Sequence, residues 1–226
     1  MRSKTPVFCL SLVLFASLPR AVRAQPAAAL VEPDWPGLLG PIPQPGSRES
    51  QDELAVLRWL QRTRTRAEVD RARSEASLEP AAFAPAIQRP FDPGSHPRTL
   101  ALLARARTDL GRVTSSLKKR YGRRRPFLDN PDLRPAVFRE PSASFPSGHA
   151  SLGALWADLL GELDPADREA IRERGAQIGT DRVLAGVHWP SDVEAGQRLG
   201  QAFASWWLAQ PDHARSLQEA RDAEWR

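Results

Sequence analysis

The sequence predicts an all-α, single-domain helical bundle with a proline-rich N-terminal arm. Runs of alternating polar and apolar residues are scarce, and the dipeptides Asn-Gly and Asp-Gly, which favour hairpin turns, are absent. Apolar residues instead recur at helical spacing in several long segments bounded by proline, serine or aspartate. With 226 residues, the chain is long enough to bury one ordinary hydrophobic core.

The first 24 residues are expected to form a secretory signal peptide. Arg2 and Lys4 provide a positive start, and the apolar run 7–18 that follows is too short to cross a bilayer as a helix. Small or tolerated residues then place the cleavage near Ala24. An uncleaved membrane anchor is the alternative, because the two kinds of segment overlap in composition. We therefore expect a periplasmic or secreted protein.

Loss of this segment changes both the charge and the cysteine content. The segment carries four basic residues and no acidic one, so the formal net charge falls from +5 to +1. A nearly neutral protein has no general field for attracting nucleic acid or anionic lipid, so no nucleic-acid partner is expected. The only cysteine, Cys9, leaves with the signal, so the mature protein has no disulfide. No later segment has the apolar length of a membrane span, and homo-oligomerisation is left open.

The arm covers residues 25–49, and we expect it to lie extended on the domain with Trp35, Leu38 and Leu39 as anchors, because its prolines exclude regular helix. The domain itself spans 50–226. Its first helix is predicted to begin at Ser50, where Ser50–Glu53 matches a capping box. The buried stripe expected on that helix consists of Leu54, Val56, Leu57, Trp59 and Leu60.

After Pro80 and Pro85 interrupt the chain, the apolar spacing predicts four longer helices. The last of them contains Gly196, Gly200 and Ala204, a ridge of small residues that favours close helix packing. Charged and amide side chains interrupt the apolar sequence of this helix, so we expect it to pack within a soluble bundle rather than within a membrane. The four helices are predicted at 99–121, 149–163, 165–178 and 191–208.

Three short segments carry residues suited to phosphate chemistry, and the first is basic. Lys118 and Arg125 are seven positions apart, which places both on one helix face if the helix continues through Gly122. Pro126 would then end the helix. Taken alone, the basic cluster 118–125 is more typical of a solvated helix face or a nucleic-acid patch.

The second segment, Pro146-Ser147-Gly148-His149, directly precedes a helical run. Free N–H groups at a helix start bind anions, and Gly148 lets a phosphate approach the backbone without a side chain in the way. In isolation, the same tetrapeptide is more typical of a capped helix start with His149 on an exposed turn.

The third segment contains Arg182, His188 and Asp192. Pro190 is expected to open the last helix, so that Asp192 in its first turn reaches back to His188. A carboxylate bonded to one ring nitrogen fixes the tautomer and leaves the other nitrogen free as a nucleophile. Alone, this spacing is better explained by an aspartate that complements the helix dipole and a histidine packed beside Trp189.

Together, the ordered pattern Lys-x6-Arg-Pro, Pro-Ser-Gly-His and Arg-x5-His-x3-Asp resembles the signature of the type 2 phosphatidic acid phosphatase and vanadium haloperoxidase superfamily. The stretches SFPSGHAS (144–151) and GVHWPSDVE (186–194) most resemble class A bacterial non-specific acid phosphatases. The likeness is tight in the three motifs and loose over residues 50–210. One departure is Asp181, which stands beside Arg182 where relatives usually have serine, and a carboxylate there can alter how the arginine is held.

The resemblance implies a phosphate-binding set and no cofactor. Lys118, Arg125 and Arg182 would hold the phosphate oxygens, with Ser147 and the backbone N–H of Gly148 completing the cradle. Charge spreads over the equatorial oxygens during phosphoryl transfer, so fixed cations can stabilise it without a metal.

The resemblance also implies three catalytic residues. His188 would attack phosphorus and become phosphohistidine, with Asp192 orienting it. His149 would protonate the departing alkoxide and then activate water, and its ordinary pKa range suits that task. The other histidines, His96 and His213, are expected to be isolated and exposed, so no metal site is predicted.

These expectations converge on an exported, metal-independent acid phosphatase that acts on small phosphomonoesters. A lipid phosphatase of the same superfamily is the first alternative, although the mature chain lacks spanning segments. A vanadium-dependent haloperoxidase is the second, because the same cradle binds vanadate, but this chain is short for that group. A non-enzymatic protein that binds through the basic cluster 118–125 is the alternative from a different class.

Overall fold

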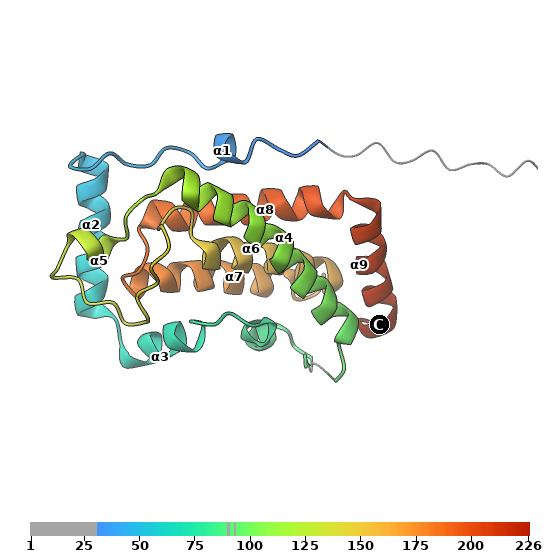
Figure 1. Ribbon diagram of the computed structural model, residues 1–226. Helices are drawn as coiled ribbons and strands as arrows, with labels where there is room; N and C mark the ends of the chain where they lie inside the picture. Colours follow the sequence, from blue (N-terminus) through green and yellow to red (C-terminus); the bar gives the residue numbers. More distant parts are fainter. Residues whose placement is uncertain (1–30, 90, 93) are drawn as a thin grey trace, which may run out of the picture.

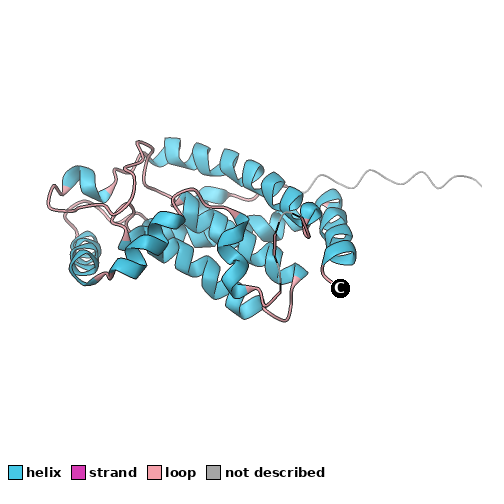
Figure 2. Ribbon diagram, turned by 90° about the horizontal axis from the view of Figure 1, so that it is seen from below, coloured by secondary structure: helices cyan, strands magenta, loops and turns pink. Residues whose placement is uncertain are grey.

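The computed structural model describes residues 31–89, 91–92 and 94–226, and within these ranges the chain folds into helices without a strand (Figures 1 and 2). The all-α prediction is confirmed. The signal peptide, its cleavage near Ala24 and Cys9 lie outside the described residues. The elements are α1 (Trp35–Leu38), α2 (Arg48–Thr63), α3 (Arg66–Ser74), η1 (Pro80–Ala86), α4 (Pro97–Tyr121), α5 (Pro126–Asp129), α6 (Gly148–Leu163), α7 (Arg168–Leu184), α8 (Pro190–Leu208) and α9 (Pro211–Glu224).

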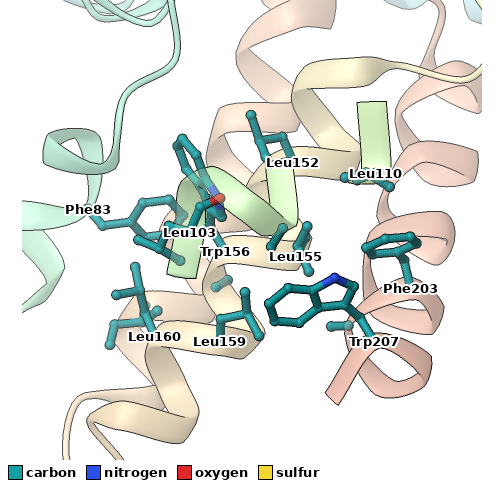
Figure 3. Packing of buried hydrophobic residues seen from close by; sticks show 14 of the residues in the cluster. Phe83, Leu103, Leu110, Leu152, Leu155, Trp156, Leu159, Leu160, Phe203 and Trp207 are labelled. Atoms are coloured by element: carbon teal, nitrogen blue, oxygen red, sulfur yellow. The ribbon is translucent and has the colours of Figure 1, made fainter. Parts of the chain in front are cut away.

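Helix α6 lies at the centre of the bundle, packed between α7 and α8, while α4 crosses in front of it and α9 closes one end (Figure 1). Twelve of the sixteen residues of α6 are buried, which explains why apolar residues occur around most of its circumference. Large side chains from several helices meet around it, including Leu103, Trp156, Phe203 and Trp207 (Figure 3). None of the described helices is both long and apolar enough to cross a membrane.

Glycines let α8 lie directly on α6. A Cβ atom added to Gly196 would lie 2.6 Å from the carbonyl oxygen of Ser147, and one added to Gly200 would collide with the carbonyl oxygen of Ser151. The predicted close packing of this ridge is therefore confirmed. The contact positions the candidate site, because it fixes the start of α6 against the first half of α8, and the N–H of Ser147 also bonds the carbonyl oxygen of Asp192 in the first turn of α8.

The N-terminal part differs from the prediction in its details. Helix α2 begins at Arg48 with Ser47 as its cap, two residues before the predicted start at Ser50. Leu57 is buried as expected, but Val56 and Trp59 are 42% and 56% exposed, because α2 lies at the edge of the bundle and buries only a narrow stripe.

The proline-rich arm contacts the domain partly as predicted. Trp35 and Leu39 are buried, whereas Leu38 is exposed. Trp35 also begins the one-turn helix α1, so the arm is not extended throughout. This helical turn tolerates Pro36 because the proline lies at its N-terminal end, where a backbone N–H has no partner within the helix.

The helix boundaries agree with the prediction only in part. Helix α4 ends at Tyr121 as predicted, because Gly122 adopts a left-handed conformation with φ 57° and terminates the helix. Helix α7 continues to Leu184 rather than ending at 178. Gly179 does not end the helix but allows it to pack closely, because a Cβ there would lie 3.0 Å from Val193 and 3.1 Å from Ala150. Helix α8 is not the last one, because Pro211 opens α9.

Candidate active site

The three phosphate-type segments meet at one end of the bundle. Lys118 comes from the last turn of α4, His149 from the first turn of α6, and Arg182 from the last turn of α7. His188 lies in the connection from α7 to α8, where its Nε2 atom is 3.2 Å from Nη1 of Arg125. The chain thus brings together cations and imidazoles that are far apart in sequence.

His188 and Asp192 form the buried centre of this arrangement. Pro190 opens α8 as predicted, which places Asp192 in its first turn. Oδ2 of Asp192 accepts a hydrogen bond from the backbone N–H of Trp189 at 2.9 Å and lies 3.3 Å from Nδ1 of His188. The hydroxyl of Ser144 donates to the same carboxylate oxygen. These contacts assign the proton of a neutral His188 to Nδ1 and direct Nε2 towards the cations.

Burial controls the protonation of this pair. Loss of water around His188 lowers its pKa to about 3, and nearby Arg125 and Lys118 act in the same direction. Burial alone would raise the pKa of Asp192, but its hydrogen bonds with His188 and Ser144 and the charge of Arg123 hold that pKa below its usual value. His188 is therefore neutral and Asp192 ionised in mildly acidic solution.

Arg125 and Lys118 do not share one helix, so the condition under which the sequence placed both on one helix face is not met. Because α4 ends before Gly122, Arg125 instead caps the short helix α5. Its guanidinium is fixed by the carbonyl oxygens of Val187 at 2.8 Å and Ser142 at 2.9 Å. Lys118 donates to the carbonyl of Ala143, and burial followed by repulsion from Arg125 lowers its pKa to about 8. Both cations are held in place without a carboxylate partner of their own in the described chain.

Ser147 and Gly148 form the start of α6. The hydroxyl of Ser147 accepts a hydrogen bond from the N–H of Ala150 at 3.4 Å, and the Ser147 N–H donates to the carbonyl of Asp192 at 2.9 Å. The nearest atom to a Cβ built on Gly148 is Cγ2 of Thr114, at 3.9 Å. Packing therefore does not require a glycine here, and the open backbone suits the approach of an anion.

His149 and Arg182 face the segment that follows α3. Nε2 of His149 donates to the carbonyl oxygens of Glu75 at 3.1 Å and Ala76 at 3.3 Å, so the ring is not on a free turn. Burial, followed by the charge of Arg182, lowers the pKa of His149 to about 4. Arg182 itself is 2% exposed and donates to the carbonyl of Ala72 at 2.6 Å.

Arg123 and Glu53 also belong to the site, although the sequence prediction missed them. Arg123 lies in the basic cluster that resembled a solvated face, but its side chain is 11% exposed and reaches Oδ1 of Asp192 at 2.7 Å. Its other nitrogen bonds Glu53 at 2.8 Å. Glu53, which was predicted to close a capping box, is buried instead. Its burial could have been inferred from its position, because Glu53 lies one helical turn before Leu57 on the same buried stripe.

The carboxylate of Asp181 does not hold Arg182 by a hydrogen bond, and only its charge acts on the arginine: burial lowers the pKa of Arg182, and that charge opposes the shift. Both of its oxygens bond Arg71 of α3, at 2.8 and 2.9 Å. The side chain that does contact Arg182 is Glu75, at 3.2 Å.

The two remaining histidines were wrongly expected to be isolated and exposed. His96 is 4% exposed and packs against the rings of Phe91 and Trp225. His213 stacks on Trp207 with ring centroids 3.7 Å apart. Neither joins the cradle. Among the residues that the structure describes, no group of three or more His, Cys, Asp or Glu side chains is placed to hold a metal ion.

Comparison with known proteins agrees with this geometry. Residues 99–216, which include all three motifs, match the family model described as the PAP2 superfamily. The chain belongs to the PAP2 superfamily. The expected superfamily is thereby confirmed, while the finer assignment to class A stays a prediction.

Several relatives carry phosphatase names. A "Non-specific acid phosphatase" of Providencia stuartii is 28% identical over 241 residues, which cover 98% of this chain and 97% of that protein. One of Salmonella typhimurium is 34% identical over 62% of this chain and 58% of its own length. A "Lipid A 1-phosphatase" of Rhizobium johnstonii is 39% identical over 42% of this chain and 40% of its own length.

A solved PAP2 structure has the same fold. It is the transmembrane PAP2 type phosphatidylglycerolphosphate phosphatase from Bacillus subtilis, which superposes with a TM-score of 0.52 over 75% of this chain and 89% of its own. With 22% sequence identity, this likeness concerns the helical architecture alone.

Proposed function

We propose that this PAP2-superfamily phosphatase is an exported acid phosphatase that hydrolyses small phosphomonoesters through a phosphohistidine intermediate, without a metal ion. The chain is a phosphatase of this superfamily. Acid phosphatase activity is favoured over a lipid substrate because the Providencia relative, whose match covers 98% of the chain, is named for it. The lipid A phosphatase match covers only 42% of the chain.

Phosphate binding is assigned to the cationic end of the bundle. Lys118, Arg125 and Arg182 would contact the phosphate oxygens, with Ser147 and the backbone N–H of Gly148 at the start of α6. The guanidiniums are fixed by carbonyl oxygens of the chain itself, so they need not reorganise when negative charge develops. This preorganisation is the role that a metal ion fills in many phosphatases.

In the first step, Nε2 of neutral His188 attacks phosphorus and the bond from phosphorus to the ester oxygen breaks. Protonated His149 gives its proton to that departing oxygen, and an alcohol leaves. The phosphorylated ring of His188 is cationic, and its Nδ1–H stays beside the carboxylate of Asp192. Asp192 thus stabilises the charge that forms on the imidazole.

In the second step, water attacks phosphorus while neutral His149 takes its proton. The bond between phosphorus and Nε2 breaks, inorganic phosphate leaves, and both histidines return to their initial states. The observation that carries the mechanism is the orientation of His188. Its Nδ1 atom is engaged by Asp192, while Nε2 faces Arg125 at 3.2 Å.

The proposed function is tested with a panel of phosphate esters, including p-nitrophenyl phosphate, at acidic and neutral pH and with or without EDTA. We expect phosphate release that is faster at acidic pH, unaffected by EDTA and absent in His188→Ala. Inactivation by EDTA with recovery on adding zinc or magnesium would contradict the metal-independent mechanism. Bromide oxidation by the vanadate-loaded protein, without phosphatase activity, would instead identify a haloperoxidase.

A further inference from the structure

Glu75 is a buried carboxylate at the edge of the candidate site. It lies outside the three motifs and before residues 99–216, which match the family model. It ends helix α3, and only 1% of its surface is exposed. A buried carboxylate is costly unless it is paired, so its partners indicate what it does.

Both carboxylate oxygens of Glu75 bond arginines of α7. Oε2 accepts a hydrogen bond from Nη2 of Arg182 at 3.2 Å. Oε1 accepts one from Nη2 of Arg174 at 2.6 Å, and Arg174 is itself anchored to the carbonyl of Ala82 at 2.8 Å. Arg174 is the nearer partner and compensates the carboxylate charge of Glu75. Glu75 can therefore hold Arg182 in place while the positive charge of Arg182 remains available to a phosphate.

The main chain of Glu75 reaches a second site residue. Its carbonyl oxygen accepts the hydrogen bond from Nε2 of His149 at 3.1 Å. One residue therefore contacts both the arginine assigned to phosphate binding and the histidine assigned to the leaving group. Burial raises the pKa of Glu75, and the hydrogen bond from Arg174 opposes that shift.

We propose that Glu75 is a positioning residue for phosphoryl transfer: its carboxylate holds Arg182 in the phosphate cradle, with Arg174 as its counterion. This inference rests on the proposed function, because it concerns the same cradle. The side chain acts through Arg182, whereas the contact with His149 is made by the backbone and survives substitution of the side chain. The two effects can therefore be separated by experiment.

The test compares Glu75→Gln and Glu75→Asp with the wild-type protein. Glutamine keeps the size of the side chain but removes its charge, and aspartate keeps the charge but shortens the reach. Vanadate binding is measured by titration calorimetry, and kcat and KM are measured on an aryl and an alkyl phosphate. We expect both variants to bind vanadate about 10- to 100-fold more weakly, by analogy with the loss seen when a residue that orients a metal ligand is removed.

Comparing the two esters distinguishes an effect of the Glu75 carboxylate on Arg182 from an effect of the Glu75 backbone on His149. Because the His149 contact is unchanged, kcat/KM should fall by the same factor on the aryl and the alkyl phosphate. A loss confined to the alkyl ester would show that Glu75 acts through His149 and would overturn the assignment to Arg182. Wild-type vanadate affinity in both variants would overturn it as well.

Asp181→Asn is the matched control. Asp181 is equally buried and joins the same two helices through Arg71, but its side chain does not reach the cradle. Melting temperatures of all variants report the structural cost. We expect Asp181→Asn to lower the melting temperature while keeping wild-type vanadate affinity, and an equal loss of affinity in this control would overturn the specific role of Glu75. Calorimetry needs no turnover, so a wild-type protein that binds vanadate but releases no phosphate would count against the proposed reaction alone.

Discussion

Nδ1 of His188 lies 3.3 Å from Oδ2 of Asp192, and both side chains are buried at the start of α8. The same carboxylate oxygen accepts the N–H of Trp189, and the other oxygen bonds Arg123. Hydrogen bonds from Trp189 and Arg123 therefore fix the carboxylate of Asp192 independently of its contact with His188. This rigidity keeps Nε2 of His188 directed at Arg125, where the proposed mechanism places the phosphate.

Asp192→Asn is expected to lower kcat by several orders of magnitude. The amide can donate a hydrogen bond to Nδ1, which favours the tautomer with its proton on Nε2, the atom that has to attack. Steady-state kinetics on p-nitrophenyl phosphate measure the loss. Asp129→Asn, which changes a half-exposed carboxylate paired with Arg124, is the matched control and should keep wild-type activity.

The pH profile of kcat/KM should have its maximum in the acidic range. His149 has to be protonated and its pKa is lowered to about 4, so the rate declines as pH rises above that value. His188 has to be neutral and its pKa is lowered to about 3, so the rate also declines below it. Both pKa values are those of the free enzyme, and the pH dependence of kcat/KM reports the pKa values of the free enzyme. A profile that is flat from pH 4 to 8 on an alkyl phosphate would refute the assigned protonation states.

His149→Ala should discriminate between leaving groups. Alkyl phosphates need a proton on the departing oxygen, whereas activated aryl phosphates need little, so the alkyl substrates should lose far more activity. The ratio of kcat/KM values for an alkyl and an aryl phosphate, compared with the wild-type ratio, measures this. Equal losses on both substrates would mean that His149 only positions the substrate.

Arg125→Ala should cost about 2 to 4 kcal/mol in the activation barrier, as for removal of one preorganised oxyanion donor. The side chain lies beside Nε2 of His188 and is held by backbone carbonyls, so it is fixed in place before charge develops there. Vanadate inhibition should weaken in parallel, because vanadate adopts the geometry of the transferring phosphoryl group. Arg124→Ala, a change at an exposed neighbour, is the control. Full activity and unchanged vanadate inhibition in Arg125→Ala would place the cradle elsewhere.

Local signals in the sequence predicted the parts of the site that depend on local structure. Pro190 marked the start of α8, and this start alone places Asp192 one turn from His188. Ser147 likewise marked the start of α6. The end of α4 at Tyr121 was predicted too, and Gly122, which adopts the left-handed conformation that glycine favours, explains why the helix does not continue to Arg125.

Long-range partners could not be predicted in the same way. Glu53 matched a local capping pattern, yet it bonds Arg123, which is 70 positions away. Asp181 was expected to influence its neighbour Arg182, but a helix directs adjacent side chains to different faces, and Asp181 meets Arg71 instead. Glu75 had no distinguishing pattern. Its role depends on how α3 packs on α7, which one sequence does not specify.

Rapid-quench labelling tests most directly whether His188 carries the phosphoryl group. Enzyme mixed with a labelled phosphomonoester is quenched in alkaline denaturant, and the labelled peptide is sequenced by mass spectrometry. We predict that the label resides on His188, withstands alkali and is released by acid, and that it is absent in His188→Ala. Label on a serine, or an active His188→Ala protein, would contradict the mechanism.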